Sequence, residues 1–159
     1  MILHWFRADL RLTDNPALTE AHALAAQLNA PLVALYIGTP AQWRAHDIGN
    51  ARIDFEARSV QTLARDLQAH GIALHTLTCA DYATVPQLLL DWCRAQGITH
   101  VFANRQYEFN ETARDRQVHR LLRQNSIEIA WHHGQCLIEP DRVRTQQGDF
   151  YTVFTPYKN

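Results

Sequence analysis

The sequence lacks the glycine-rich and serine motifs that mark several large enzyme classes. Its 159 residues include six glycines and two serines. No GxGxxG, GxxxxGKS or GxxxxGKT segment follows an apolar run, so the usual backbone loops for dinucleotide or nucleotide phosphates are missing. Neither serine stands in the GxSxG turn of many hydrolases. These absences argue against a dinucleotide-dependent dehydrogenase, a P-loop nucleotidase and a serine hydrolase.

Cysteines and metal-binding motifs are also scarce. The three cysteines, Cys79, Cys93 and Cys136, are odd in number and contain no CxxC pair. This usage is typical of a reduced, intracellular protein, and we expect free thiols in the core. Nine histidines are present, but none forms an HxH or HExxH motif. We therefore expect neither disulfides nor a metal site.

The chain has no long apolar run and no excess of charge. No segment approaches the roughly 20 apolar residues of a membrane span, and no secretory leader is recognisable, so we expect a cytoplasmic protein without a membrane partner. The 15 basic residues are balanced by 16 acidic ones, so the sequence has no excess of positive charge with which to bind nucleic acid. Acidic residues interrupt the densest basic cluster, which we interpret as a solvated helix face: Arg114, Arg116, Arg120 and Arg123.

Short apolar runs alternate with amphipathic segments through the first 133 residues. Asn15 is suited to cap the first helix, because Pro16 can take the first helical position without losing a hydrogen bond. Residues 39–50 are expected to form a loop. The apolar runs predict strands over 2–6, 32–37, 72–77, 99–103 and 127–131, and the segments between them predict helices over 16–29, 53–70, 84–97 and 110–123.

This alternation predicts an α/β fold with one parallel sheet and helices on both faces. We expect a three-layer, Rossmann-like, doubly wound sheet of five strands, in the order 3-2-1-4-5 when strands are numbered along the chain. Residues 1–133 would form this domain. Residues 134–159 contain prolines, glycines and polar runs without a helical period. We expect them to form an extended arm outside the sheet.

In this order the winding reverses between the first and fourth strands, where open α/β sheets bind ligands. The polar loops 7–14 and 104–110 would meet there. Asn110 and Glu111 have two interpretations, one as the N-cap and first turn of the fourth helix. In the other, the amide and carboxylate bind a heterocycle that has adjacent N–H donors, such as a pterin. His46 would approach from the loop after the second strand.

Three charged residues follow the first strand and also have two interpretations. Arg7, Asp9 and Arg11 could bind an anionic ligand at the reversal point. They could instead form an ion-pair network that holds the loop or docks another domain. We favour the network, because Asp9 would neutralise much of the local positive charge.

Four segments resemble a known family. They are HWFRADLRLTDNPAL (4–18), YIGTPAQWRAHD (36–47), NRQYEFNETARDR (104–116) and VFTPYKN (153–159). Together they resemble the amino-terminal α/β domain of DNA photolyases and cryptochromes, most closely that of bacterial cyclobutane pyrimidine dimer photolyases with a folate antenna. The resemblance extends over the whole chain.

The resemblance implies the first part of a two-domain deoxyribodipyrimidine photo-lyase. A helical domain beyond this chain would bind FAD and damaged DNA, and excited flavin would split the dimer by electron transfer. The present chain would not be catalytic alone. It would help to bind an antenna, methenyltetrahydrofolate or in some members a deazaflavin, with Asn110 and Glu111 at the pterin and His46 nearby.

Two other interpretations stay open at the sequence level. The chain could belong to a cryptochrome that senses light without repairing DNA, or it could be a stand-alone nucleotide-binding α/β module. In isolation, the surface that a partner domain would cover could support a weak homodimer.

Overall fold

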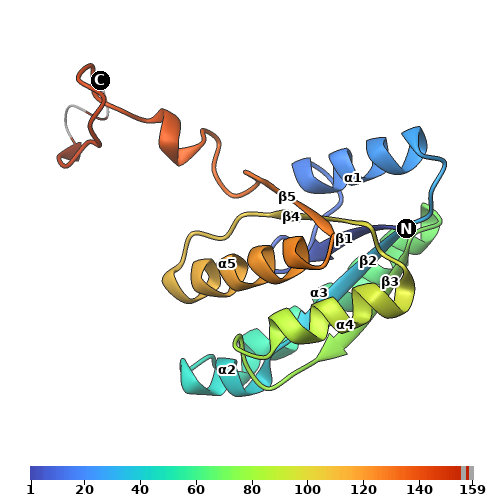
Figure 1. Cartoon of the computed structure of the whole chain (residues 1–159). Coiled ribbons are helices and arrows are strands. Elements are labelled where there is room, and N and C mark those ends of the chain that lie inside the picture. Colours follow the sequence, from blue (N-terminus) through green and yellow to red (C-terminus); the bar gives the residue numbers. More distant parts are fainter. Residues whose placement is uncertain (155–156, 158–159) are drawn as a thin grey trace.

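The computed structural model describes residues 1–154 and 157. Within them the chain alternates strands and helices (Figure 1). The elements are β1 (Ile2–Phe6), α1 (Pro16–Gln27), β2 (Leu32–Gly38), α2 (Pro40–Ala45), α3 (Asn50–Ala69), β3 (Ala73–Thr78), α4 (Val85–Gln96), β4 (His100–Asn104), α5 (Phe109–Gln124), β5 (Glu128–His132) and a 3-10 turn at Pro140–Arg142.

The five strands form one sheet in the order β3-β2-β1-β4-β5, and all neighbours are parallel. This confirms the predicted fold class and strand order. The winding direction reverses between β1 and β4, so the loops after these two strands meet at one edge of the sheet. The predicted bounds of the strands differ from the observed ones by one residue or less at most ends.

Helices cover both faces of the sheet (Figure 1). On one face, α1 and α3 pack over Ile2, Phe6 and Ala34. On the other, α4 and α5 pack over Leu3 and Trp5. β1 is buried along its whole length, because its side chains point alternately to the two faces of the sheet and helices cover both faces. The central strand therefore anchors both cores.

Polar side chains fix the reversal point between β1, β4 and α1. Asn15 caps α1 as predicted, and its Oδ1 accepts the Leu18 N–H at 3.1 Å. Asn104 Nδ2, at the end of β4, donates to Asp9 Oδ2 at 2.6 Å and to Asn15 Oδ1 at 2.7 Å. Because these side chains are buried and satisfied, they hold the three segments in one arrangement.

Two predictions of local structure are wrong, one for residues 39–50 and one for the start of the fourth predicted helix. Residues 39–50 are not all loop, since Pro40 begins the short helix α2 and the Trp43 N–H donates to Thr39 O at 3.1 Å. Helix α5 begins at Phe109 with Glu108 as its N-cap, so Asn110 is not the cap. Glu108 has an extended backbone, φ −64° and ψ 152°. The helix thus begins one residue before the predicted start at residue 110, and its N-cap lies two residues before Asn110.

Two burial predictions also need correction. Arg114 does not lie on a solvated face but is 5% exposed, because α5 turns this side chain toward the sheet. The cysteines are all free in the structure, but only Cys93 is buried, while Cys79 is half-buried and Cys136 is exposed. Burial raises the pKa of the Cys93 thiol to about 12, which keeps it protonated and unreactive at neutral pH.

Residues after β5 leave the sheet as an arm (Figure 1). Its described part adds no strand, and the domain boundary near residue 133 stays a prediction. Arg11 Nη2 donates to Gly134 O at 2.5 Å and so ties the start of the arm to the loop after β1. A Cβ at Gly134 would lie 2.7 Å from the Asn104 side chain. Residues 155–156 and 158–159 of the VFTPYKN segment lie outside the described residues.

Candidate functional site

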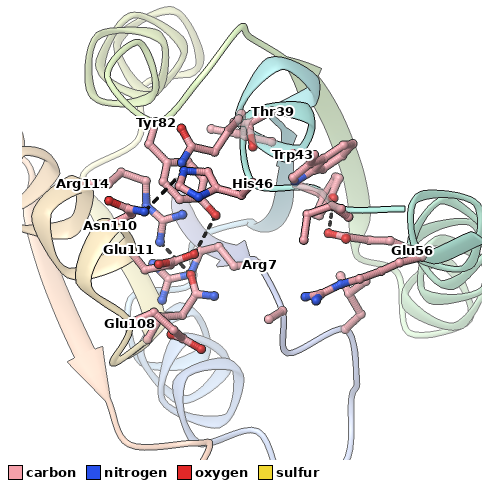
Figure 2. A pocket seen from close by; sticks show the side chains of 18 of the residues that line it. Arg7, Thr39, Trp43, His46, Glu56, Tyr82, Glu108, Asn110, Glu111 and Arg114 are labelled. Carbon is pink, nitrogen blue, oxygen red and sulfur yellow. Dashed lines mark hydrogen bonds between the residues drawn. The ribbon is translucent and has the colours of Figure 1, made fainter. Parts of the chain in front are cut away.

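A pocket of about 600 Å³ opens at the carboxyl edge of the sheet (Figure 2). Its walls come from the loops after β1, β3 and β4, from the end of β2, and from α2, α3 and α5. This is the edge where the winding reverses. The volume is within the range of about 300–1,000 Å³ usual for small-molecule sites.

The pocket brings together all three residues selected from the sequence. His46, Asn110 and Glu111 line it. Asn110 Nδ2 lies 3.5 Å from His46 Nε2, although the two residues are 64 positions apart in the chain. His46 follows α2 directly, and Asn110 and Glu111 stand in the first turn of α5. The neighbourhood expected from the strand order is therefore present.

A tyrosine that sequence reasoning missed holds the Glu111 carboxylate. The Tyr82 hydroxyl, from the loop after β3, donates to Glu111 Oε1 at 2.9 Å. Burial, and next the charge of Glu111, raise the pKa of Tyr82 to about 12. Tyr82 is therefore a protonated donor at neutral pH. No sequence motif marks this residue, and only the folded arrangement of the β3 and β4 loops reveals it.

A second tyrosine and carboxylate pair lies across the pocket and was also missed. The Tyr36 hydroxyl, from β2, donates to Glu56 Oε1 of α3 at 2.5 Å. Burial and this hydrogen bond raise the pKa of Tyr36 above its usual value. Figure 2 shows Glu56 and Glu111 approaching the pocket from opposite sides. Each carboxylate therefore has a fixed hydrogen-bond donor behind it.

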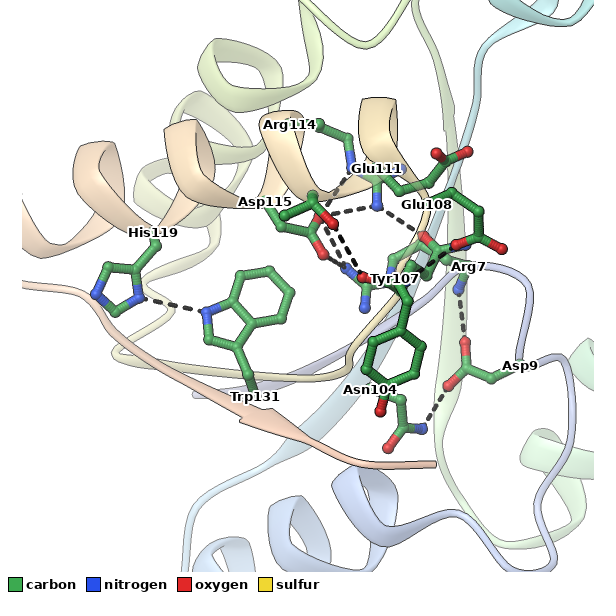
Figure 3. A network of polar contacts seen from close by, with 12 residues as sticks. Arg7, Asp9, Asn104, Tyr107, Glu108, Glu111, Arg114, Asp115, His119 and Trp131 are labelled. Atoms are coloured by element: carbon green, nitrogen blue, oxygen red, sulfur yellow. Dashed lines mark hydrogen bonds and ion pairs between the residues drawn. The ribbon is translucent and has the colours of Figure 1, made fainter. Parts of the chain in front are cut away.

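In the pocket wall, two buried arginines share one carboxylate (Figure 3). Arg7 Nη1 donates to Asp115 Oδ2 at 3.2 Å, and Arg114 Nη2 donates to Asp115 Oδ1 at 2.8 Å. The Arg7 guanidinium also lies over the rings of Trp5 and Trp131, with distances of 4.6 and 5.1 Å to the ring centroids. Burial lowers the pKa of Arg7 to about 10, so it remains cationic at neutral pH.

This network explains the charged residues after β1. Arg7 is ion-paired, and its backbone N–H donates to Asp9 Oδ1 at 2.9 Å. The Arg11 guanidinium donates to the carbonyls of Asp14 and Gly134. The structure supports the interpretation that these residues hold the loop in place rather than bind an anion, although within the described residues only Arg7 is ion-paired, and its partner is Asp115 rather than Asp9.

Arg114 connects this network to the pocket wall. Its guanidinium lies 4.6 Å from the Tyr82 ring centroid, and its Nη2 also donates to Gln106 Oε1 at 2.7 Å. Tyr82 in turn holds Glu111. The orientation of the Glu111 carboxylate therefore depends on a chain of contacts that begins at the half-buried Asp115.

Apolar side chains complete the pocket. Ile37, Trp43 and Ile48 line one part of the wall, and Phe55 stands 67% exposed beside it. Flat aromatic and branched surfaces of this kind can pack against a ring system, while the polar groups fix its orientation. No group of three or more His, Cys, Asp or Glu suited to a metal ion occurs in the described part of the chain.

The fold and the pocket together define an α/β domain with a pocket at the carboxyl edge of its parallel sheet. A family model described as DNA photolyase matches residues 2–159. The chain belongs to the DNA photolyase family.

Curated relatives and solved structures agree with this membership. The chain is 37% identical over 160 residues to a deoxyribodipyrimidine photo-lyase of Vibrio cholerae and 38% identical over 157 residues to one of Salmonella typhimurium. These matches cover 99% of this chain but 33% and 32% of the relatives. The chain therefore spans about a third of the length of the curated relatives it matches.

Among solved structures, a class III photolyase from Agrobacterium tumefaciens has a TM-score of 0.73 and 28% identity, covering 97% of this chain and 30% of that one. A Synechocystis cryptochrome has a TM-score of 0.80 and 27% identity, covering 99% and 32%. Both resemble this chain in fold along nearly its whole length. None of the helices in the described residues is long and apolar enough to cross a membrane.

Proposed function

We propose that this chain is the antenna-binding domain of a light-driven deoxyribodipyrimidine photolyase. One observation carries the proposal: His46, Asn110 and Glu111, from two distant segments, line a single pocket in a chain of the DNA photolyase family. The ligand that we assign to this pocket is methenyltetrahydrofolate. When bound, it would absorb light and pass the energy to the flavin of the same protein.

The residues of the pocket fit a pterin ring. The Tyr82 hydroxyl donates a hydrogen bond to one carboxylate oxygen of Glu111. Within the described residues, the structure shows no hydrogen bond to the other oxygen. That oxygen can accept from the amino and ring N–H groups of a pterin, and the Asn110 amide can donate and accept beside it. Trp43 and Ile48 offer apolar surface to the ring system. The chain's own part is to bind and orient.

The remaining chemistry belongs, in this proposal, to another part of the protein. A helical domain would bind FAD and damaged DNA, and the present chain alone would not be catalytic. The difference in length from the relatives leaves room for such a domain. A cytoplasmic location and weak self-association of the isolated chain stay predictions.

A cryptochrome is the second candidate, favoured by the structural similarity to the Synechocystis protein. The two candidates share the antenna site and differ in whether the whole protein repairs DNA. Repair of thymine dimers by the complete gene product, loaded with FAD, separates them.

An action spectrum of repair tests the proposal. We expect the complete gene product to repair thymine dimers in two wavelength bands, one from the folate and one from the flavin. Glu111→Gln should remove most of the folate band and keep the flavin band, because the variant changes only antenna binding. A protein that binds FAD but repairs at no wavelength would favour the cryptochrome, and an unchanged folate band would refute the site.

A further inference from the structure

Glu56 is a pocket carboxylate with a fixed donor on one oxygen. It lies half-buried on α3, and its Oε1 accepts from the Tyr36 hydroxyl at 2.5 Å. Tyr36 is itself 8% exposed at the end of β2, so the donor has little freedom to move. Within the described residues, no hydrogen bond is formed by the second oxygen of Glu56.

Glu56 takes part in no ion pair among the described residues. Arg52, one helical turn earlier on α3, also lines the pocket, but it is exposed and is not paired with Glu56. Arg7 and Arg114 lie in the same pocket but are paired with Asp115, and Arg11 donates to backbone carbonyls. The pocket therefore contains a half-buried carboxylate whose charge is left for a ligand to balance.

The position of Glu56 sets where that charge acts. Glu56 faces the pocket from the side opposite Glu111 (Figure 2). Its charge also contributes to the raised pKa of Tyr82, which holds Glu111. The charges of Glu56 and Glu111 thus both act on Tyr82, and a single ring system can lie between the two carboxylates.

We propose that Glu56, held by Tyr36, is the counterion of a cationic ligand and makes the pocket selective for the charged form of the folate. The inference rests on the proposed function, because it specifies the charge of the same ligand. The methenyl bridge of methenyltetrahydrofolate is an amidinium-type cation. In 5-formyltetrahydrofolate the pterin, the aminobenzoyl ring and the tail are the same, but the five-membered ring that the bridge closes is open and N5 carries an uncharged formyl group.

Equilibrium dialysis of both folates against the 159-residue chain tests this assignment. Glu56→Gln keeps the shape and the acceptor for Tyr36 but removes the charge. We expect it to weaken binding of methenyltetrahydrofolate about tenfold and to change binding of 5-formyltetrahydrofolate less than about twofold. Tyr36→Phe, which keeps the ring and frees the carboxylate, should weaken binding of the cation alone, to a smaller extent.

Asp54→Asn is the matched control. It removes the same charge from the same helix, but Asp54 is exposed, pairs with Arg58 at 2.7 Å and does not line the pocket. It should bind both folates like the wild type. An equal loss of both folates in Glu56→Gln would overturn the counterion role.

The failure of this inference is distinguishable from that of the proposed function. If Glu56→Gln binds both folates like the wild type while Glu111→Gln binds neither, the counterion role is wrong and the folate site stands. If the wild-type chain binds neither folate, both the inference and the site assignment are wrong.

Discussion

Replacing Asp115 with asparagine is expected to lower the free energy of unfolding by about 3–5 kcal/mol. Asp115 is 12% exposed at its side chain and is the only carboxylate paired with the buried Arg7 and Arg114 among the described residues. Asparagine keeps a hydrogen-bond acceptor but removes the charge, so two buried guanidinium groups lose their counterion. Urea unfolding followed by circular dichroism measures this loss as a lower midpoint at an unchanged slope.

The matched comparison is an exposed ion pair. Asp54→Asn breaks the pair with Arg58, in which both side chains are about two-thirds exposed. Surface pairs at this helical spacing contribute only about 0.3–0.5 kcal/mol. If Asp115→Asn were destabilised no more than Asp54→Asn, the buried network would not stabilise the domain as described.

Acidification is expected to destabilise the protein through His4, with an effect of about 3 kcal/mol between pH 6.5 and pH 4. His4 is fully buried in β1, and neither ring nitrogen has a hydrogen-bond partner among the described residues. Burial lowers the pKa of His4 from 6.5 to about 4. Nearby, Asp9 opposes this shift, while Arg7 and His132 add to it.

The direction in which stability changes with pH follows from proton binding at His4. Between pH 6.5 and 4 the unfolded chain binds a proton at His4 and the folded chain does not, so stability falls as the pH falls. His4→Leu has a similar volume and cannot be protonated, so its stability should depend less steeply on pH over this range. His22→Gln, at an exposed site on α1, should retain the wild-type slope. Parallel profiles for wild type and His4→Leu, from urea unfolding at several pH values, would contradict the role of His4.

The fold was largely predictable because its signals are local. The apolar run that became β1 ends before the charged Arg7, and the run that became β2 lies between Pro31 and Pro40; both boundaries hold within one residue in the structure. Right-handed parallel crossovers leave few topologies, and the order 3-2-1-4-5 was the preferred one among them. This order places the loops after β1 and β4 at one edge, which points to Asn110 and Glu111. His46, in the segment after β2, was assigned to the antenna site through the resemblance to the photolyase family.

The failures at the site come from tertiary contacts that no local pattern encodes. Arg114 stands among other charged residues and so has the pattern of a solvated face. Its burial depends on Asp115 and on the rings of Trp5 and Tyr82, which only the folded chain brings together. Glu56 was missed for the same reason, because its partner Tyr36 is 20 residues earlier and belongs to a strand.

The start of α5 could not be predicted for a different reason. Asn110 and Glu108 are both residues that can begin a helix, and residue preferences at a cap differ by only about 1 kcal/mol. Packing of the neighbouring turn can outweigh such a difference. The helix begins at Phe109, and Asn110, freed from capping, has its amide beside His46 in the pocket.

Titration of the chain with methenyltetrahydrofolate is the most direct test of the assigned site, with Glu111→Gln as the variant and Glu108→Gln as its control. Glu108 lines the same pocket, but it is exposed and its Oε2 accepts the Tyr107 N–H. We expect saturable binding to the wild type, a loss of affinity of at least about tenfold in Glu111→Gln and near-normal binding in Glu108→Gln. Equal affinity in wild type and Glu111→Gln would contradict the assignment of this pocket as the antenna site.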